Sequence, residues 1–414
     1  MIILKIDINR ALIAVSKTEE NFTSTPSFHG INVGFMCYRL ALTMGKPEPL
    51  CQKALICGLL HDCGVSSQDE IRRLLNDEVD VGVDSQHSIR GYRMLQECAP
   101  LRQFARPVQY HHGDWRRARD GGLTEEECFL SSIVNLCDRL DVACRKTRIF
   151  DLLQHGQESE IVIEPVYDYL IANSDCAAFY PGILAALHEM IEVDDFWFYF
   201  RAHYIETLIL KQDLNALFPA QTRQYFIDIA QFFSRIVDNK STYTYQHSRK
   251  VAELAFFIAS KMGVDEAGRY QIFVAGLLHD VGKLFTDEEV LNKKGRLDNA
   301  EYKTIRRHVT DTRAILRYIL DSEKVVTWAA DHHERLDGSG YPLRKRAGQL
   351  ALESRIMAVA DVFQALCQHR PYRSSLPLEQ AIAIVNDEAS GGKLCPEVVA
   401  VFNQHVRECY RIAT

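Results

Sequence analysis

The chain has 414 residues, of which 47% are hydrophobic and 25% are charged, and its formal net charge is −7. This composition is typical of a globular protein with room for two or three domains, and it excludes a disordered or fibrous chain. The negative balance excludes an overall basic field, so we expect no bulk nucleic-acid binding, and local groups must bind any phosphate.

The first residues and the cysteines indicate the compartment. The start, MIILKIDINRALIAV, lacks the basic region, apolar core and cleavage site of a signal peptide. No uninterrupted apolar run reaches the roughly 18–20 residues of a membrane helix. The 12 cysteines include no C-x-x-C pair, which argues against a disulfide framework and a zinc knuckle. We therefore expect a cytoplasmic protein without a membrane partner.

The run GLLHD occurs twice, at 58–62 and at 276–280. A shift of 218 residues aligns His29 with His247 and His61-Asp62 with His279-Asp280 without a gap. Such self-similarity indicates an internal duplication. We predict a first half at 1–195, a helical linker at 196–219 and a second half at 220–414.

The predicted elements of the second half are helices. In 249–263 apolar residues recur at i, i+3, i+4 and i+7, and Gly263 ends the pattern. The segment 270–280 is apolar on nearly every side, which is typical of a helix inside a domain. The segments 301–320 and 353–369 continue the helical pattern. The fold class that we predict is all-α, with two tandem helical bundles.

One order of polar residues recurs in both halves: His, then His-Asp, then His, then His-His, then Asp. The spacing from the third His to the His-His pair is 24 residues in each half. In the second half the residues are His247, His279, Asp280, His308, His332, His333 and Asp361. In the first half they are His29, His61, Asp62, His87, His111, His112 and Asp138.

This pattern predicts a metal centre. A buried helix that ends in His279-Asp280 carries a carboxylate into apolar surroundings, which is costly unless the charge is paired or bound to metal. A mixed set of imidazoles and carboxylates suits iron or manganese, with nickel and zinc as alternatives, better than magnesium or calcium. Seven ligands are too many for one ion. They suit two ions about 3.5–4 Å apart with one bridging carboxylate, an arrangement used for displacement at phosphorus.

Each element alone also has an ordinary explanation. A single His-Asp pair usually makes a hydrogen bond at a helix end, the run DGSG at 337–340 could be only a turn, and Arg370 and Arg373 could be solvated charges. The recurrence of the whole set in two otherwise diverged halves favours the metal.

Four motifs of the second half are similar to a known family. HDVGK at 279–283, KKGRL at 293–297, HHERLDGSGYP at 332–342 and RPYR at 370–373 resemble the HD-GYP family of the HD phosphohydrolase superfamily. The resemblance covers about 220–414. It implies an all-α, metal-dependent phosphodiesterase of bacterial second-messenger signalling, which opens cyclic dinucleotides, usually cyclic di-GMP, to linear products.

The resemblance also implies roles for single residues. It assigns one metal to His247, His279, Asp280 and Asp361, and the other to His308, His332 and His333, with Asp280 bridging. Lys283 would face the scissile phosphate. The remaining implied contacts with the substrate are Gly340 and Tyr341 of the GYP loop at a base, and Arg370 and Arg373 at phosphates.

Departures from the family pattern affect the expected metals and substrate. Some members have a glutamate and a third metal where this chain has Tyr243, so we expect two metals. Thr312 replaces a usual glycine, and LFTDEE follows Lys283 where an Ile-Pro step is common. These changes leave the hybrid cyclic GMP-AMP open as the substrate.

The first half resembles the wider HD superfamily only. It keeps the ligand set, but Val65 replaces the lysine and HHGDWRRARDGG replaces the GYP loop. We therefore expect it to bind metal without recognising a cyclic dinucleotide. It could support the second half, or it could act as a phosphomonoesterase (a 5′-nucleotidase) on the linear product.

Two other functions remain open from the sequence. The protein could be a non-catalytic sensor or scaffold that binds the nucleotide and signals through a partner protein, or it could be a general nucleotide phosphohydrolase. A homo-oligomer is also open.

Overall fold

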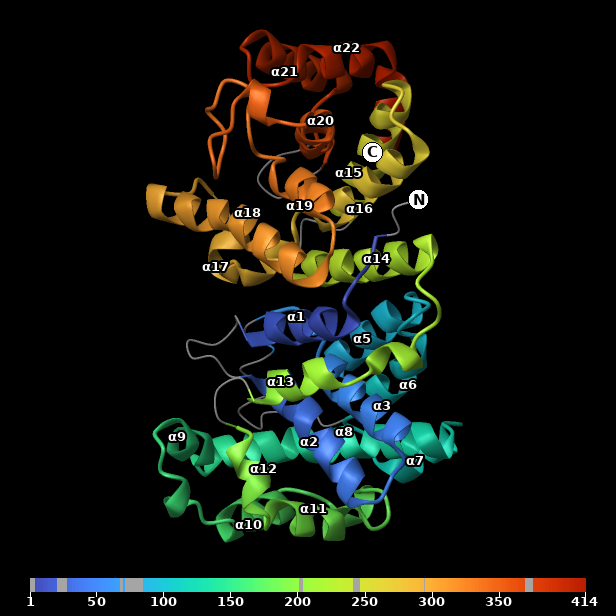
Figure 1. Ribbon diagram of the computed structural model, residues 1–414, viewed down its shortest axis with the longest axis vertical. Helices are drawn as coiled ribbons and strands as arrows, with labels where there is room; N and C mark the ends of the chain where they lie inside the picture. Colours follow the sequence, from blue (N-terminus) through green and yellow to red (C-terminus); the bar gives the residue numbers. More distant parts are fainter. Residues whose placement is uncertain are drawn as a thin grey trace. The chain divides into compact units, whose positions relative to one another are not determined.

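The computed structural model describes residues 4–20, 28–67, 70, 85–200, 204–240, 246–293, 295–368 and 375–414. These residues form helices joined by short turns, with two isolated bridges and no β-strand among them (Figure 1). The prediction of an all-α fold is confirmed. Within the described ranges, no helix is both long enough and apolar enough to span a bilayer.

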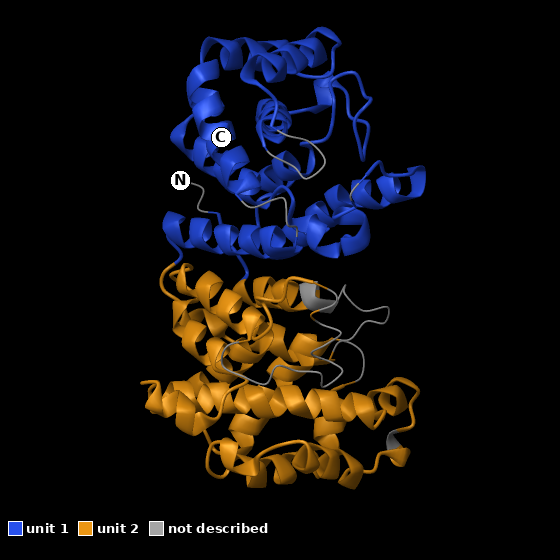
Figure 2. Cartoon of the chain, turned by 180° about the vertical axis from the view of Figure 1, so that it is seen from behind, with its two compact units in different colours: residues 1–7, 221–414 blue, residues 8–220 orange. Residues whose placement is uncertain are grey.

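The chain divides into two compact units (Figure 2). The N-terminal unit contains residues 8–220, and the C-terminal unit contains residues 1–7 together with 221–414. The helices of the N-terminal unit are α1 (Ile8–Glu20), α2 (His29–Thr43), α3 (Glu48–Leu60), α5 (Gln86–Gln96), α6 (Ala105–Gln109), α7 (Trp115–Asp120), α8 (Glu125–Lys146), α9 (Ile149–Gln154), α10 (Glu164–Ala172), α11 (Ile183–Ile191), α12 (Asp194–Phe198) and α13 (Tyr204–Lys211).

The C-terminal unit repeats the helical design. Its elements are α14 (Arg223–Lys240), α15 (His247–Lys261), α16 (Glu266–Leu278), the 3₁₀ turn η5 (Val281–Phe285), α17 (Glu288–Leu291), α18 (Asn299–Ile319), α19 (Glu323–Ala330), α20 (Leu352–Cys367), α21 (Leu378–Ser390), α22 (Pro396–Gln404) and α23 (Val406–Ala413).

The predicted duplication is visible in the helices. α2 and α15 begin and end at residues 218 apart, and so do α3 and α16. Within each unit the two helices cross at small residues. A Cβ on Gly58 of α3 would lie 2.6 Å from the Cα of Gly34 of α2, and a Cβ on Gly276 of α16 would lie 2.5 Å from the Cα of Ala252 of α15. Close crossing of the helix backbones requires glycine at these points, so the two halves share one packing solution.

The predicted apolar stripes lie in the core. Along α15 the side chains of Val251, Leu254, Ala255 and Ile258 are buried, as the helical period predicts. α16 is buried along its second half, in agreement with its nearly continuous apolar sequence. Asp265 accepts a hydrogen bond from the Gly268 amide and begins this helix.

The compact units differ from the expected halves at two places. Ile6 forms a bridge with Leu320, and the Lys5 amide donates to Asp321, so this first segment packs with the C-terminal unit. The expected linker, in contrast, packs within the N-terminal unit, where Phe196 and Trp197 of α12 are buried. The domain boundaries at 195 and 220 stay a prediction.

Candidate metal centres

The seven polar residues predicted in the second half lie together in the C-terminal unit. His247 is the first residue of α15, and His279 directly follows the last residue of α16. The others come from separate elements: Asp280 before η5, His308 in α18, His332 and His333 after α19, and Asp361 in α20. Helix packing therefore assembles side chains that are up to 114 residues apart in sequence.

The carboxylate of Asp280 lies between two groups of histidines. Its Oδ2 is 3.3 Å from Nε2 of His279 and 3.6 Å from Nε2 of His247. Its Oδ1 is 3.4 Å from Nε2 of His308 and 3.9 Å from Nε2 of His332. One carboxylate whose two oxygens face two ligand groups has the geometry that a bridging ligand requires.

Asp361 closes the cluster on its more open side. Its Oδ1 is 3.4 Å from Nε2 of His247, and its Oδ2 is 3.8 Å from Nδ1 of His333. The side chains of His333 and Asp361 are 22% and 10% exposed, whereas that of Asp280 is 3% exposed. A ligand can therefore approach the cluster beside His333.

The chemistry of these donors fits metal ions. Nε2 of His279, His308 and His332 and Oδ1 of Asp280 are buried and have no hydrogen-bond partner. Buried polar atoms are normally hydrogen-bonded, and leaving one unpaired costs roughly 1–3 kcal/mol. Metal ions account for four such atoms directed at one another. Two groups could each hold one ion: one is His247, His279 and Asp280, and the other is His308, His332 and His333.

Backbone carbonyls orient three of these rings. Nδ1 of His279, His308 and His332 lies 2.7, 2.5 and 2.7 Å from the carbonyl oxygen three residues earlier in each case. In its neutral form each ring therefore donates from Nδ1 and keeps a lone pair on Nε2, the tautomer of a metal ligand. Burial lowers the pKa of His308 to about 4 and that of His332 to about 3, so both rings are neutral at pH 7.

Lys283 lies beside the bridging position. Its Nζ is 2.5 Å from Oδ2 of Asp280 and its side chain is 18% exposed. Burial alone would raise the pKa of Asp280, but the neighbouring His279 and Lys283 hold it well below its usual value. The carboxylate is therefore ionised, with a compact cation next to it.

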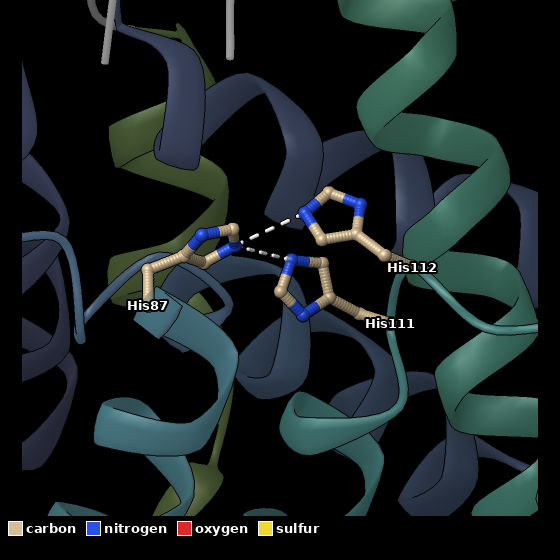
Figure 3. A group of neighbouring side chains, drawn as sticks. All are labelled: His87, His111 and His112. Carbon is tan, nitrogen blue, oxygen red and sulfur yellow. Dashed lines mark hydrogen bonds between the residues drawn. The ribbon is translucent and has the colours of Figure 1, made fainter. Parts of the chain in front are cut away.

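The N-terminal unit contains an equivalent cluster. Nε2 of His87 lies 3.0 Å from Nε2 of His112 and 3.5 Å from Nε2 of His111, and the three rings point toward one another (Figure 3). His29, His61 and Asp62 form a second group that could hold an ion. The structure thus brings together the predicted ligands of the first half as well.

The central carboxylate of this second cluster has the same arrangement. Oδ2 of Asp62 is 3.5 Å from Nε2 of His61, and its Oδ1 is 3.5 Å from Nε2 of His87. Asp138 closes the cluster, with its Oδ1 3.3 Å from Nε2 of His29. Burial raises the pKa of Asp62 to about 6, although His29 and His111 act in the opposite direction. The residue equivalent to Lys283 is Val65, which has no charge.

A second difference lies behind the first histidine of each cluster. Nδ1 of His29 lies 2.8 Å from Oδ2 of Asp141, whose carboxylate also accepts from Asn32 and Arg145. At the equivalent place Nδ1 of His247 lies 2.5 Å from Oε1 of Gln364. A carboxylate behind a histidine raises the basicity of the ring more than an amide does. The repeat pattern did not identify either residue, because neither belongs to the recurring His and Asp set.

Glycines bring the His-Asp segment close to the helix of the third histidine. A Cβ on Gly282 would lie 1.9 Å from the carbonyl oxygen of His308, and a Cβ on Gly64 would lie 2.1 Å from that of His87. Only glycine permits this approach. Thr312, a departure from the family pattern, accepts a hydrogen bond from the Gly282 amide and donates one to the His279 carbonyl. Thr312 therefore stabilises the contact between the His-Asp segment and α18.

The residue before the first histidine has a left-handed backbone conformation in both units. Phe28 has φ 46° and Gln246 has φ 68°, although neither is glycine. Such conformations cost roughly 1–3 kcal/mol and persist where the surroundings enforce them. Each one starts its helix so that His29 or His247 enters the cluster from the first turn.

A buried glutamate stabilises the GYP loop, the segment that contains residues 340–342. Glu334 is buried, and its two carboxylate oxygens accept hydrogen bonds from the amides of Leu343 and Lys345 at 2.7 and 2.8 Å. A Cβ on Gly340 would lie 2.4 Å from the Arg335 amide nitrogen, so this glycine gives room to the loop's own backbone. The ring of Tyr341 packs on that of His333, with centroids 4.8 Å apart. Substrate contacts of Gly340 and Tyr341 stay predictions.

Some residues singled out in the sequence lie outside the described residues. These are Tyr243, Arg370 and Arg373. The expected phosphate contacts of the two arginines therefore stay predictions.

Comparison with known proteins gives two domain matches. Residues 28–143 and residues 231–407 each match a model of the HD domain. The 3′3′-cGAMP-specific phosphodiesterase 1 of Vibrio cholerae is 32% identical over 99% of this chain and 94% of its own length. The cyclic di-GMP phosphodiesterase of Thermotoga maritima is 30% identical over 51% of this chain and 60% of its own.

A solved structure supports the fold. The crystal structure of a cyclic GMP-AMP specific phosphodiesterase of V. cholerae aligns over 98% of both chains with a TM-score of 0.60 and 21% identity. At this identity the likeness concerns the arrangement of helices and not the chemistry.

Proposed function

We propose that the C-terminal unit hydrolyses a cyclic dinucleotide. The premise is that this chain belongs to the HD-GYP family of HD-domain phosphohydrolases and carries two HD domains in tandem. The observation that carries the proposal is the carboxylate of Asp280, whose two oxygens face two groups of histidines while Lys283 lies beside it. The product is a linear dinucleotide. Water forms the new bond to phosphorus, and the ring's ester oxygen leaves as a hydroxyl.

The metals that fit this donor set are two divalent transition-metal ions. Iron or manganese is our first choice, with nickel and zinc as alternatives, because imidazole nitrogen dominates a site that also contains carboxylates. When bound, the ions withdraw charge from phosphoryl oxygens and supply a nucleophile near neutral pH. Asp280 would bridge them, and the remaining ligands of the second half would hold one or the other.

The protein's own groups position the substrate. Lys283 donates to a phosphoryl oxygen, where negative charge grows in the transition state. Tyr341, with Gly340 in the same loop, stands at the base end of the substrate beside His333, and Arg370 and Arg373 bind phosphates. The more exposed face at His333 and Asp361 supports entry of the substrate on this side.

The substrate that we favour is 3′3′-cyclic GMP-AMP, with cyclic di-GMP as the alternative. The relative that spans nearly the whole chain is named for the first nucleotide, whereas the relative named for the second matches about half of it.

The reaction itself is a direct test. Purified full-length protein should convert 3′3′-cyclic GMP-AMP to a linear dinucleotide with added manganese or iron, and a chelator should abolish conversion because the clustered histidines cannot act alone. Liquid chromatography of the products measures both. Tight binding without any product would favour the sensor function, and equal turnover of unrelated nucleotides would favour a general phosphohydrolase.

The N-terminal unit retains a complete ligand cluster, which favours a second metal centre there. We propose that this centre either stabilises the unit and supports the catalytic half, or removes the terminal phosphate of the linear product as a 5′-nucleotidase. The absence of a lysine at Val65 makes it unsuited to opening the cyclic dinucleotide.

A double variant separates the two roles. The variant His61→Ala, Asp62→Ala should lose the metal of the N-terminal unit, as measured by elemental analysis, and still open the cyclic dinucleotide. Accumulation of phosphorylated linear product would assign the nucleotidase role, and a lower melting temperature with unchanged products would assign the supporting role. Undiminished metal content would exclude a metal centre in this unit. The matched change in the C-terminal unit, His279→Ala, Asp280→Ala, should stop ring opening.

A further inference from the structure

The guanidinium of Arg306 lies against two tyrosines at the edge of the C-terminal cluster. Its Cζ is 4.6 Å from the ring centroid of Tyr341 and 5.9 Å from that of Tyr302. The two tyrosine rings meet edge to face, with centroids 6.4 Å apart. Because Tyr341 also packs on His333, one aromatic ring separates the guanidinium from a ligand of the cluster.

Arg306 has no anionic partner in the part of the chain that the structure describes. Nearby arginines do have one: Arg307 pairs with Asp311 at 3.3 Å, and Arg313 pairs with Asp331 at 3.0 Å. Arg306 instead contacts the two tyrosine rings. Among the described residues its charge is therefore held by aromatic rings and is paired with no carboxylate.

A guanidinium in this position can bind a planar acceptor. It offers five N–H donors in a rigid fork, and a flat contact with a ring leaves these donors free at its edges. Tyr302 precedes it by one turn of α18 and is 49% exposed, so an aromatic surface lies beside the fork. A purine base can stack on such a surface while the acceptor atoms at its edge accept hydrogen bonds from the guanidinium.

We infer that Arg306 and Tyr302 form the site that recognises a guanine of the substrate. Arg306 donates two hydrogen bonds to O6 and N7, and Tyr302 stacks on the base. Guanine presents two acceptors to this fork, whereas adenine presents one acceptor and one donor. The inference rests on the proposed function and refines it, since both proposed substrates contain guanine.

This arrangement gives Tyr341 a different task. Its ring already contacts the guanidinium of Arg306 and the imidazole of His333, so it holds the base-reading group in position relative to the cluster. Tyr341 at the base end of the substrate then positions Arg306, and Arg306 donates the hydrogen bonds to the base.

The test compares Arg306→Ala and Arg306→Lys with the wild type on three ligands. For 3′3′-cyclic GMP-AMP and cyclic di-GMP, KM should rise by about ten- to a hundred-fold in both variants, since lysine keeps the charge but lacks the fork. Inhibition by cyclic di-AMP, which contains no guanine, should change by less than about threefold. Metal content and kcat should stay near wild type. Arg307→Ala, one residue away and already paired with Asp311, is the matched control and should leave every value unchanged.

Other outcomes overturn the inference in different ways. Equal weakening for all three ligands, with rescue by lysine, would make Arg306 a phosphate contact. Unchanged KM would mean that Arg306 touches no substrate. If the wild type hydrolyses none of the ligands, the proposed function fails, and calorimetric affinities for cyclic di-GMP and cyclic di-AMP in the same variants still test guanine recognition. If Arg306→Ala does not fold, Arg306→Lys and Arg306→Gln provide the same comparison.

Discussion

Replacing Asp280 by alanine should remove turnover of the cyclic dinucleotide and strip metal from the C-terminal unit. Its two oxygens lie between the two histidine groups and are more deeply buried than those of Asp361, so the loss of this carboxylate removes the central contact between the groups. A loss of several kcal/mol of charge stabilisation corresponds to at least about a thousand-fold in kcat. Elemental analysis of the purified variant and a product assay measure the two effects.

The matched control for this change is Asp62→Ala, at the equivalent place in the other unit. It should remove metal from the N-terminal unit and leave ring opening intact. Asp280→Asn distinguishes charge from shape, because it keeps the volume and loses the anion. Full turnover in Asp280→Ala would refute the assignment of two metals bridged by this residue.

Replacing Lys283 by alanine should lower kcat by about a hundred- to a thousand-fold, the loss expected for one donor to the transition state. Metal content should persist, since the lysine contacts Asp280 through one ammonium group and is not itself a ligand. Steady-state kinetics and elemental analysis on the same preparation separate these effects. KM should change less than kcat, because Lys283 acts mainly on the negative charge that grows in the transition state beyond the single charge of the bound diester.

Two further variants control this result. Lys283→Met keeps the apolar stem of the side chain and should lose as much kcat as alanine does. Val65→Ala, at the equivalent position of the N-terminal unit, should leave ring opening unchanged. If metal is lost together with Lys283, the lysine stabilises the ionised Asp280 and has no separate role at the phosphate.

The ligand clusters could be predicted from the sequence because the same order of His and Asp residues occurs in both halves. Each His and Asp appears twice at nearly constant spacing. A histidine next to an apolar helical pattern can be assigned to that helix without knowledge of the rest of the fold. The position of His279 at the end of α16 followed from the apolar run at 270–280, whereas the helical pattern at 249–263 did not show that α15 begins at His247.

The residues around the clusters could not be predicted in this way. Asp141 reaches His29 across 112 residues of sequence, and Gln364 reaches His247 across 117, through contacts that depend on how α8 and α20 pack. They differ in chemistry between the halves, so the repeat itself concealed them. The close approach of Gly340 to the backbone at Arg335 was also not evident from the sequence, and its contact with the substrate stays a prediction.

The first segment and the expected linker show a limit of a different kind. Ile6 joins the C-terminal unit through one bridge with Leu320, a contact with no periodicity to reveal it. The segment 196–219 is predicted as a linker, and Phe196 and Trp197 within it are buried in the N-terminal unit, where Phe196 stacks on Phe35. A sequence repeat alone does not show with which unit such a segment packs.

The backbone contact at Gly64 and Gly282 has an evolutionary consequence. In both units the His-Asp segment is fixed by glycine against the helix of the third histidine, and the next residue makes the same amide hydrogen bond, from Val65 to Asp62 and from Lys283 to Asp280, at 2.9 Å. The local main chain therefore does not depend on which side chain follows the glycine. A duplicated copy could exchange its lysine for valine by point mutation while its ligand geometry was inherited intact, so that the ability to hold metal and the ability to act on a phosphate ester were free to diverge separately.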